Sequence, residues 1–152
     1  MRGFVLGAAS LAILGAAWGQ PVGAQEVIQD RETIRACLCQ QQALTTLFGA
    51  VQERQQNYEA SQKTLASLNQ ELETRRAQID VYNDAQVDAY KQLLARSDQA
   101  AIALADEATP SFNDAVTRYN EALAGYTTQC GGKSFNQTVY RAVQATLSCP
   151  KP

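Results

Sequence analysis

Residues 44–82 read LTTLFGAVQERQQNYEASQKTLASLNQELETRRAQIDVY, and this stretch decides the fold. Apolar side chains recur in it every seven residues, at Leu44, Val51, Tyr58, Leu65, Leu72 and Ile79. A second set follows three residues behind, at Leu47, Leu68 and Tyr82. This heptad pattern contains no proline, so it predicts one long amphipathic helix whose apolar seam needs another helix to cover it.

The first 24 residues differ from the rest of the chain. Arg2 is their only charge, an apolar run of about fifteen residues follows, and small residues end the segment at Ala24. The pattern predicts a secretory signal peptide over residues 1–24. The apolar run is shorter than the roughly 20 residues of a spanning helix, so no membrane span is expected after cleavage. We expect residues 25–152 to form a single exported domain, periplasmic or secreted.

The charged residues and the absence of histidine limit which classes of function we expect. The chain has 13 basic and 15 acidic side chains and no histidine. A slightly acidic protein lacks the excess positive charge that attracts nucleic acid or an anionic membrane, so neither is the expected partner. Without histidine the commonest general base and most zinc sites are missing, and the prediction is a non-enzymatic protein without a cofactor or metal. A composition rich in Ala, Gln and Arg and poor in Lys is typical of a Gram-negative bacterium, hence of a periplasmic location.

The heptad register breaks just after Tyr82. Its continuation would place Gln86 in the seam, whereas the apolar residues that follow are Val87, Tyr90, Leu94, Ala101 and Leu104. A slip of one residue beside Asn83-Asp84, both turn-tolerant, predicts a reversal of the chain there. The alternative is an uninterrupted helix that continues to Ala108.

The last third of the chain predicts two more segments. Thr109-Pro110 indicates the start of a helix or a kinked continuation, with an apolar seam at Phe112, Val116, Tyr119, Leu123, Tyr126 and Cys130. Gly131-Gly132 ends it. Ser134 and Gln137 form a predicted capping box for a short last helix, whose apolar face is Phe135, Val139, Val143 and Leu147. At the other end, residues 25–30 are polar and expected to be frayed, with Asp30 capping the long helix. No strand pattern is visible.

These patterns predict an all-α fold, a long antiparallel coiled-coil-like helical hairpin with a short C-terminal helix. A reversal at Asn83-Asp84 places Leu44 opposite Leu123, Val51 opposite Val116 and Leu65 opposite Ile102. It also places Cys37 opposite Cys130, although the cysteines were not used to choose the reversal. The seam has gaps at Arg54, Ser61 and Arg75, whose side chains either extend outward or leave the middle of the rod locally soft.

Four cysteines in an exported domain predict two disulfides. Cys37 and Cys39 point about 200° apart on a helix and should not bond to each other. The expected pairs are Cys37–Cys130 and Cys39–Cys149, with the crossed pairing as the alternative. Bonds that close such long loops are expected to hold together a hairpin with a thin core.

The tip is the candidate site for a protein partner in the cell envelope. Tyr82, Val87 and Tyr90 flank the predicted reversal, and exposed tyrosines make good anchors for a partner. Alternatively, Tyr82 and Tyr90 pack on each other and close the turn. A heptad seam is satisfied within one chain or between chains, so a homo-oligomer is a further alternative.

Two other functions remain open. The long exported hairpin resembles periplasmic holdase chaperones, which grip unfolded outer-membrane proteins between helical arms. The resemblance is one of architecture only. Such arms are typically basic and need no cysteines, whereas this chain is slightly acidic and has four cysteines. The second alternative is a thiol–disulfide exchange protein that uses Cys37 and Cys39.

Overall fold

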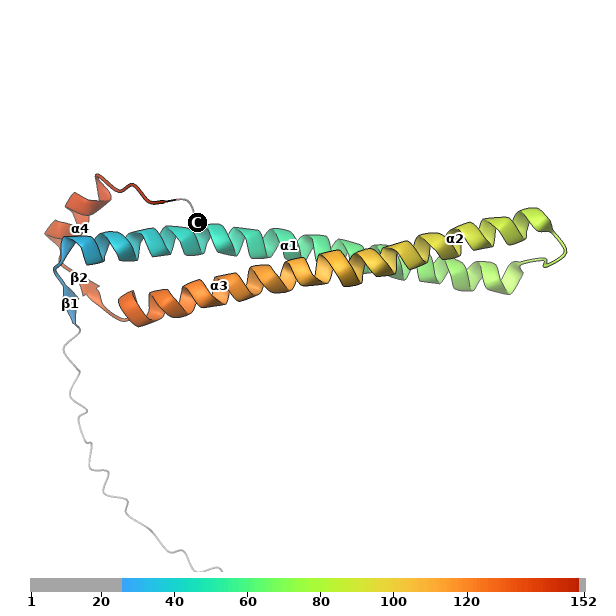
Figure 1. Ribbon diagram of the computed structural model, residues 1–152, viewed down its shortest axis with the longest axis horizontal. Helices are drawn as coiled ribbons and strands as arrows, with labels where there is room; N and C mark the ends of the chain where they lie inside the picture. The colour runs from blue at the N-terminus through green and yellow to red at the C-terminus, as the bar shows by residue number, and fades with distance from the viewer. Residues whose placement is uncertain (1–25, 151–152) are drawn as a thin grey trace, which may run out of the picture.

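A computed structural model describes residues 26–150; the signal peptide predicted for residues 1–24 lies outside the described residues. The elements in chain order are β1 (Val27–Ile28), α1 (Arg31–Gln78), α2 (Asp84–Ala103), the π-helix η1 (Leu104–Ala108), α3 (Thr109–Cys130), β2 (Ser134–Phe135) and α4 (Gln137–Gln144). Helix α1 forms one arm of a long rod, and α2, η1 and α3 return beside it as the other arm (Figure 1). We call the end with the turn the tip and the end with α4 the base.

Contacts between the arms show that they run antiparallel. From base to tip, they are the Cys37–Cys130 bond, the ring pairs Phe48–Tyr119 (centroids 5.8 Å apart) and Tyr58–Phe112 (5.7 Å), and the hydrogen bond from Ser97 Oγ to Asn69 Oδ1 (2.8 Å). As the residue number rises along α1, the number of its partner falls. The predicted hairpin is therefore confirmed, and the alternative of an uninterrupted helix to Ala108 is wrong.

The predicted seam of α1 faces the second arm from Leu44 to Leu72, but the helix ends at Gln78, so the prediction that Tyr82 belongs to the seam is wrong. Its apolar residues are half-buried between Leu44 and Leu68, and Leu72 is 9% exposed. Arg54 and Arg75 interrupt the seam with exposed side chains, and Arg75 Nε turns aside to Glu71 Oε1 at 2.8 Å. The alternative in which the side chains extend outward is therefore correct at Arg54 and Arg75, whereas Ser61 is half-buried.

The seam of α2 differs from the prediction at Leu94 and Ala101, which are exposed, whereas Val87, Tyr90 and Leu104 are half-buried. Leu93 and Ser97 are buried, with 1% and 5% exposure, whereas Leu94 is 43% exposed. Ile102 is 59% exposed, so the predicted core pair of Leu65 and Ile102 is wrong. Two adjacent leucines fit a heptad equally well in either phase, and the predicted seam used Leu94, which lies seven residues before Ala101.

Thr109-Pro110 does not begin a separate helix. Proline has no N–H to donate, and its ring would collide with the carbonyl four residues earlier in a regular α-helix. The chain widens into the π-turn of η1 just before it, and both the backbone N–H and the hydroxyl of Thr109 bond to the carbonyl of Leu104. The kinked continuation is correct, and the wide turn rephases α3 relative to α2.

The base holds the largest group of buried residues. Ile28, Ile34, Cys37, Leu38, Cys130 and Val143 form its centre, with Tyr126, Phe135, Val139, Tyr140 and Leu147 packed around them. Both predicted disulfides are present, Cys37–Cys130 and Cys39–Cys149, and the crossed pairing is wrong. The first crosslinks the two arms, and the second attaches the tail after α4 to α1.

Two details of the base differ from the prediction. Val27 and Ile28 are not frayed, because they pair in parallel with Ser134 and Phe135 in a two-stranded ladder. Ser134 therefore does not cap α4; the side chain of Asn136 accepts from the N–H groups of Thr138 and Val139 instead. A two-residue strand is too short to produce an alternating pattern, so the sequence offered no signal for it.

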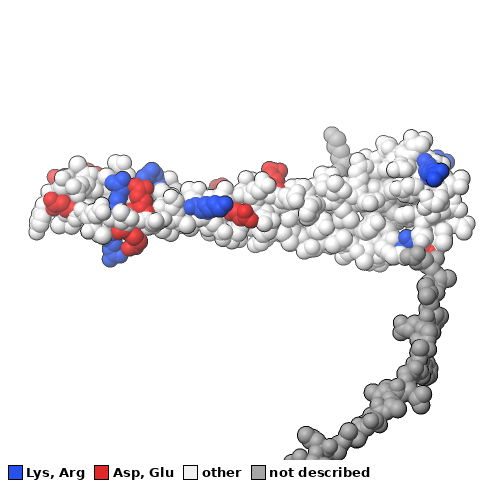
Figure 2. Space-filling view, turned by 180° about the vertical axis from the view of Figure 1, so that it is seen from behind, with Lys and Arg blue, Asp and Glu red and all other residues white. Residues whose placement is uncertain are grey.

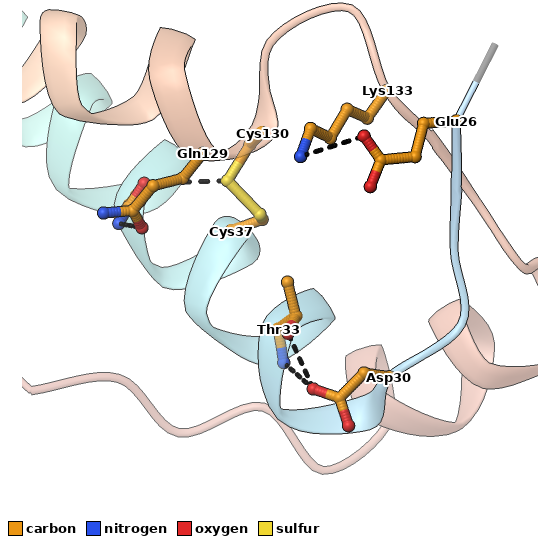
Figure 3. The surroundings of a disulfide bond; sticks show 8 residues. Glu26, Asp30, Thr33, Cys37, Gln129, Cys130 and Lys133 are labelled. Carbon is orange, nitrogen blue, oxygen red and sulfur yellow. Dashed lines mark hydrogen bonds and ion pairs between the residues drawn. A yellow bond between two sulfur atoms is a disulfide. The ribbon is translucent and has the colours of Figure 1, made fainter.

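The start of α1 is capped as expected. Asp30 Oδ2 accepts from the backbone N–H and from the hydroxyl of Thr33, both at 2.7 Å (Figure 3). The Thr33 hydroxyl first, and then its N–H, hold the pKa of the Asp30 carboxyl below its ordinary range. Within residues 26–150, no helix combines the length and the apolar character that crossing a membrane requires.

Candidate partner-binding site at the hairpin tip

The tip is a tight turn held by side chains on both of its flanks. Helix α1 stops at Ile79, which has an extended backbone, and Asn83 caps α2 by accepting from the N–H of Gln86 at 3.3 Å. Gln86 reaches back, and its side-chain oxygen accepts from the N–H of Asp80 at 2.8 Å. This arrangement resembles a capping box, except that the return bond from Gln86 goes to Asp80, three residues before the Asn83 cap, and not to the cap itself.

The turn also bonds within itself. Asp80 Oδ1 accepts from the N–H of Tyr82 at 2.9 Å, and the N–H of Asn83 donates to the carbonyl of Asp80 at 3.0 Å. These bonds satisfy the polar groups of the turn with its own atoms. The two residues between Asp80 and Asn83 are therefore free to project their side chains from the end of the rod.

Those two side chains are the most exposed large apolar groups in the described chain. Tyr82 is 93% exposed and Val81 is 66% exposed. Because Tyr82 is almost fully in solvent, it does not pack on Tyr90 to close the turn, and that interpretation is wrong. Sequence analysis missed Val81, although its position beside Asp80 in a turn was the available signal.

A shallow groove lies behind the apex, between the end of α1 and the start of α2. It encloses about 440 Å³ and is lined by Arg75, Gln78, Ile79, Asn83, Ala85, Gln86, Ala89 and Tyr90. Of the three predicted partner-binding residues, only Tyr90 lines this groove. Val87 is half-buried, and Tyr82 projects from the turn. The exposed apex therefore lies beside a groove of mixed polarity whose lining includes Arg75.

A second hollow occurs at mid-rod, where the seam has its gap. It measures about 250 Å³ and lies between Arg54, Asn57 and Ser61 on α1 and Ala103, Glu107, Ala108 and Ser111 on the other arm. The wide turn of η1 and the missing apolar side chain at position 54 together account for it. The sequence located this weak point from Arg54 and Ser61, but not its shape.

The cysteines are joined in two separate disulfides. Cys37 and Cys39 belong to different disulfides, and Cys37 and Cys130 are buried at 2% and 3% exposure. Figure 3 shows the Cys37–Cys130 bond between the two arms, beside the ion pair of Lys133 with Glu26 (3.3 Å) that joins the strand ends. Within residues 26–150, no group of three or more His, Cys, Asp or Glu side chains is arranged to hold a metal ion.

Comparison with known proteins found no matching family model, no matching curated protein and no matching solved structure.

Proposed function

We propose that this chain is an exported, non-enzymatic protein of the cell envelope that presents a helical hairpin to a protein partner. The apolar apex carries the proposal: Tyr82 and Val81 stand in solvent at 93% and 66% exposure on a turn whose hydrogen bonds are satisfied internally. A side chain that is exposed on a preordered turn loses little conformational freedom on binding, which favours its use as an anchor.

The cysteines support the proposed compartment. All four are in disulfides, which form and persist in oxidising compartments. Together with the signal peptide expected over residues 1–24, this supports a periplasmic or secreted protein. The buried Cys37–Cys130 bond supports a structural role for the cysteines over thiol–disulfide exchange, because exchange needs an accessible sulfur.

The distribution of apolar surface favours a dedicated partner over many unfolded clients. The exposed large apolar side chains are spread over base, shaft and tip, at Val27, Phe48, Val81, Tyr82, Leu94, Ile102 and Leu123. A holdase needs a broad continuous apolar surface. The apex instead offers two adjacent side chains beside a groove, a pattern suited to one complementary surface.

The test is photo-crosslinking in the native cell envelope. A photo-reactive residue replaces Tyr82 in one strain and Lys63, exposed on the shaft, in a control strain. One dominant protein captured at position 82 and not at 63 is the expected result, and Val81→Asp in the same chain should abolish the capture. A broad mixture of unfolded envelope proteins would favour the holdase, and equal capture at both positions would contradict a tip-specific partner.

A further inference from the structure

The half of the rod nearest the base is poor in charge. Helix α1 has no charged residue between Arg35 and Glu53, and α3 has none between Glu121 and Cys130, where it ends. Figure 2 shows the consequence: charged side chains gather over the tip half and at the base, and a broad uncharged surface lies between them. Such a surface on an 18% charged chain needs an explanation.

One side of this half combines exposed apolar groups with amides. Phe48 packs on Tyr119 across the two arms yet stays 48% exposed, and Leu123, one turn beyond Tyr119, is 38% exposed. Exposed residues one or two turns away on the same helix faces are polar and uncharged. We call this set the amide face: Gln41, Phe48, Gln52 and Gln55 on α1, and Asn120, Leu123 and Thr127 on α3.

The charged residues of this region point elsewhere. Glu53 and Arg54 lie five and six residues from Phe48, and Arg118 and Glu121 lie five and two residues from Leu123. At 3.6 residues per turn these spacings place all four away from the amide face. The first charge along the face is Glu59, which accepts a hydrogen bond from Gln55 and marks the edge of the amide face toward the tip.

We propose that the amide face is a dimer interface that binds a second copy of this chain. In a two-fold contact the same patch meets itself, and groups near the two-fold axis lie close to their own copies, so a charge near the centre of the patch would face a like charge. An uncharged face avoids that repulsion. Amide groups both donate and accept hydrogen bonds, so they are complementary to their own copies. Phe48 and Leu123 supply the apolar centre, and the two hairpins together form a four-helix bundle, which covers the seam that one hairpin leaves half-buried.

The charges also select the arrangement. A parallel dimer would bring the two copies of Glu59 together, whereas an antiparallel dimer centred near Phe48 separates them by roughly 33 Å along the rod. In the antiparallel dimer the two tips project from opposite ends. Phe48 is about 47 Å from the tip end of α1, so the dimer should be roughly 95 Å long, against about 75 Å for one hairpin.

The size of the face sets the strength expected. Residues 41–55 cover roughly 20 Å of rod and two helices about 20 Å of width, or about 400 Å² per copy and about 800 Å² in total, which is the size of a weak, transient interface. We therefore expect a weak dimer that dissociates at about 100 micromolar. Its formation does not depend on the tip, so a tip variant that loses its partner should still dimerise.

The test is sedimentation velocity on the oxidised exported chain over a concentration series. Wild type should shift from monomer to dimer, and Phe48→Glu should weaken the dimer at least tenfold. Ile102→Glu is the matched control, because Ile102 is 59% exposed on the other part of the shaft, and should change the affinity less than twofold. Circular dichroism melting checks that both variants are folded. Gln52→Glu, a change at an exposed position, provides a second weakening variant should Phe48→Glu unfold.

Three results would overturn the proposal. The first is a wild-type chain that stays monomeric at several hundred micromolar. The second is dissociation by Ile102→Glu that equals the effect of the charge at position 48 or 52. The third is a dimer whose maximum length in small-angle X-ray scattering stays near that of a single hairpin, because that length requires the parallel arrangement.

Discussion

The hydroxyl of Ser97 donates a hydrogen bond to the side-chain oxygen of Asn69, 2.8 Å away on the opposite arm. Ser97 is 5% exposed and follows the buried Leu93 by one turn on α2. This polar pair lies at the only part of the described shaft between base and tip where residues are fully buried. A polar contact inside a coiled-coil seam fixes which residues face one another.

We expect this pair to contribute a measurable coupling energy. Ser97→Ala and Asn69→Ala should each lower the free energy of unfolding, and a double-mutant cycle should give a coupling of about 0.5–1.5 kcal/mol. The measurement is urea unfolding followed by circular dichroism. Ser67→Ala, at an exposed position of α1 two residues before Asn69, is the control and should change little. A coupling near zero would mean that Asn69 finds water as readily as Ser97.

The two glycines after α3 should respond differently to alanine. A Cβ at Gly131 would lie 2.5 Å from the carbonyl oxygen of Thr127, which is backbone and cannot move aside. Gly132 has φ +68° and open space around it, so alanine there costs only the left-handed strain of about 1 kcal/mol. We expect Gly131→Ala to destabilise by more than Gly132→Ala in urea unfolding. The reverse order would show that the end of α3 shifts easily.

The two disulfides should differ in their effect on stability. They close loops of similar length, 93 and 110 residues, so the chain-entropy model values both at about 4–5 kcal/mol. Cys37 and Cys130 are also buried in the base, whereas Cys39 and Cys149 are half-buried at its edge. The Cys37→Ala/Cys130→Ala variant should therefore lose more than Cys39→Ala/Cys149→Ala, by roughly 1–2 kcal/mol.

Urea unfolding of the two double variants measures this difference, with mass spectrometry to confirm that the remaining disulfide is formed. Equal losses would show that loop closure alone sets the contribution of each bond and that burial at the base adds nothing.

The cap at Asp30 predicts a dependence of stability on acid. Because its pKa is lowered in the folded protein, the carboxylate stabilises the fold above its unfolded pKa of about 3.9. That contribution should disappear as the pH falls from about 4 through the lower folded value. Thermal melting of wild type and Asp30→Asn at pH 6 and pH 2.5 tests it, since asparagine caps a helix without titrating. The two proteins should differ less at pH 2.5 than at pH 6.

The sequence already contained the hairpin and its disulfides, because both depend on regular spacing. A seven-residue period from Leu44 to Ile79 needs a facing helix, and a reversal near Asn83 brings Cys37 opposite Cys130 through chain geometry alone. The position of Asp30 before a helical run was equally readable as a cap. The candidate site at the tip was predicted from the same spacing, because a turn between two apolar seams leaves the side chains of the turn exposed.

Only the tertiary structure decided the phase of α2, the wide turn of η1 and the strand pair at the base. Leu93 and Leu94 are equivalent to a period of seven, and packing against α1 chose Leu93. The pairing of Val27 with Ser134 depends on contacts between residues more than a hundred positions apart. The exposure of Phe48 depends in the same way on what else the folded chain places over it, whereas spacing along a sequence records only which residues share a helix face.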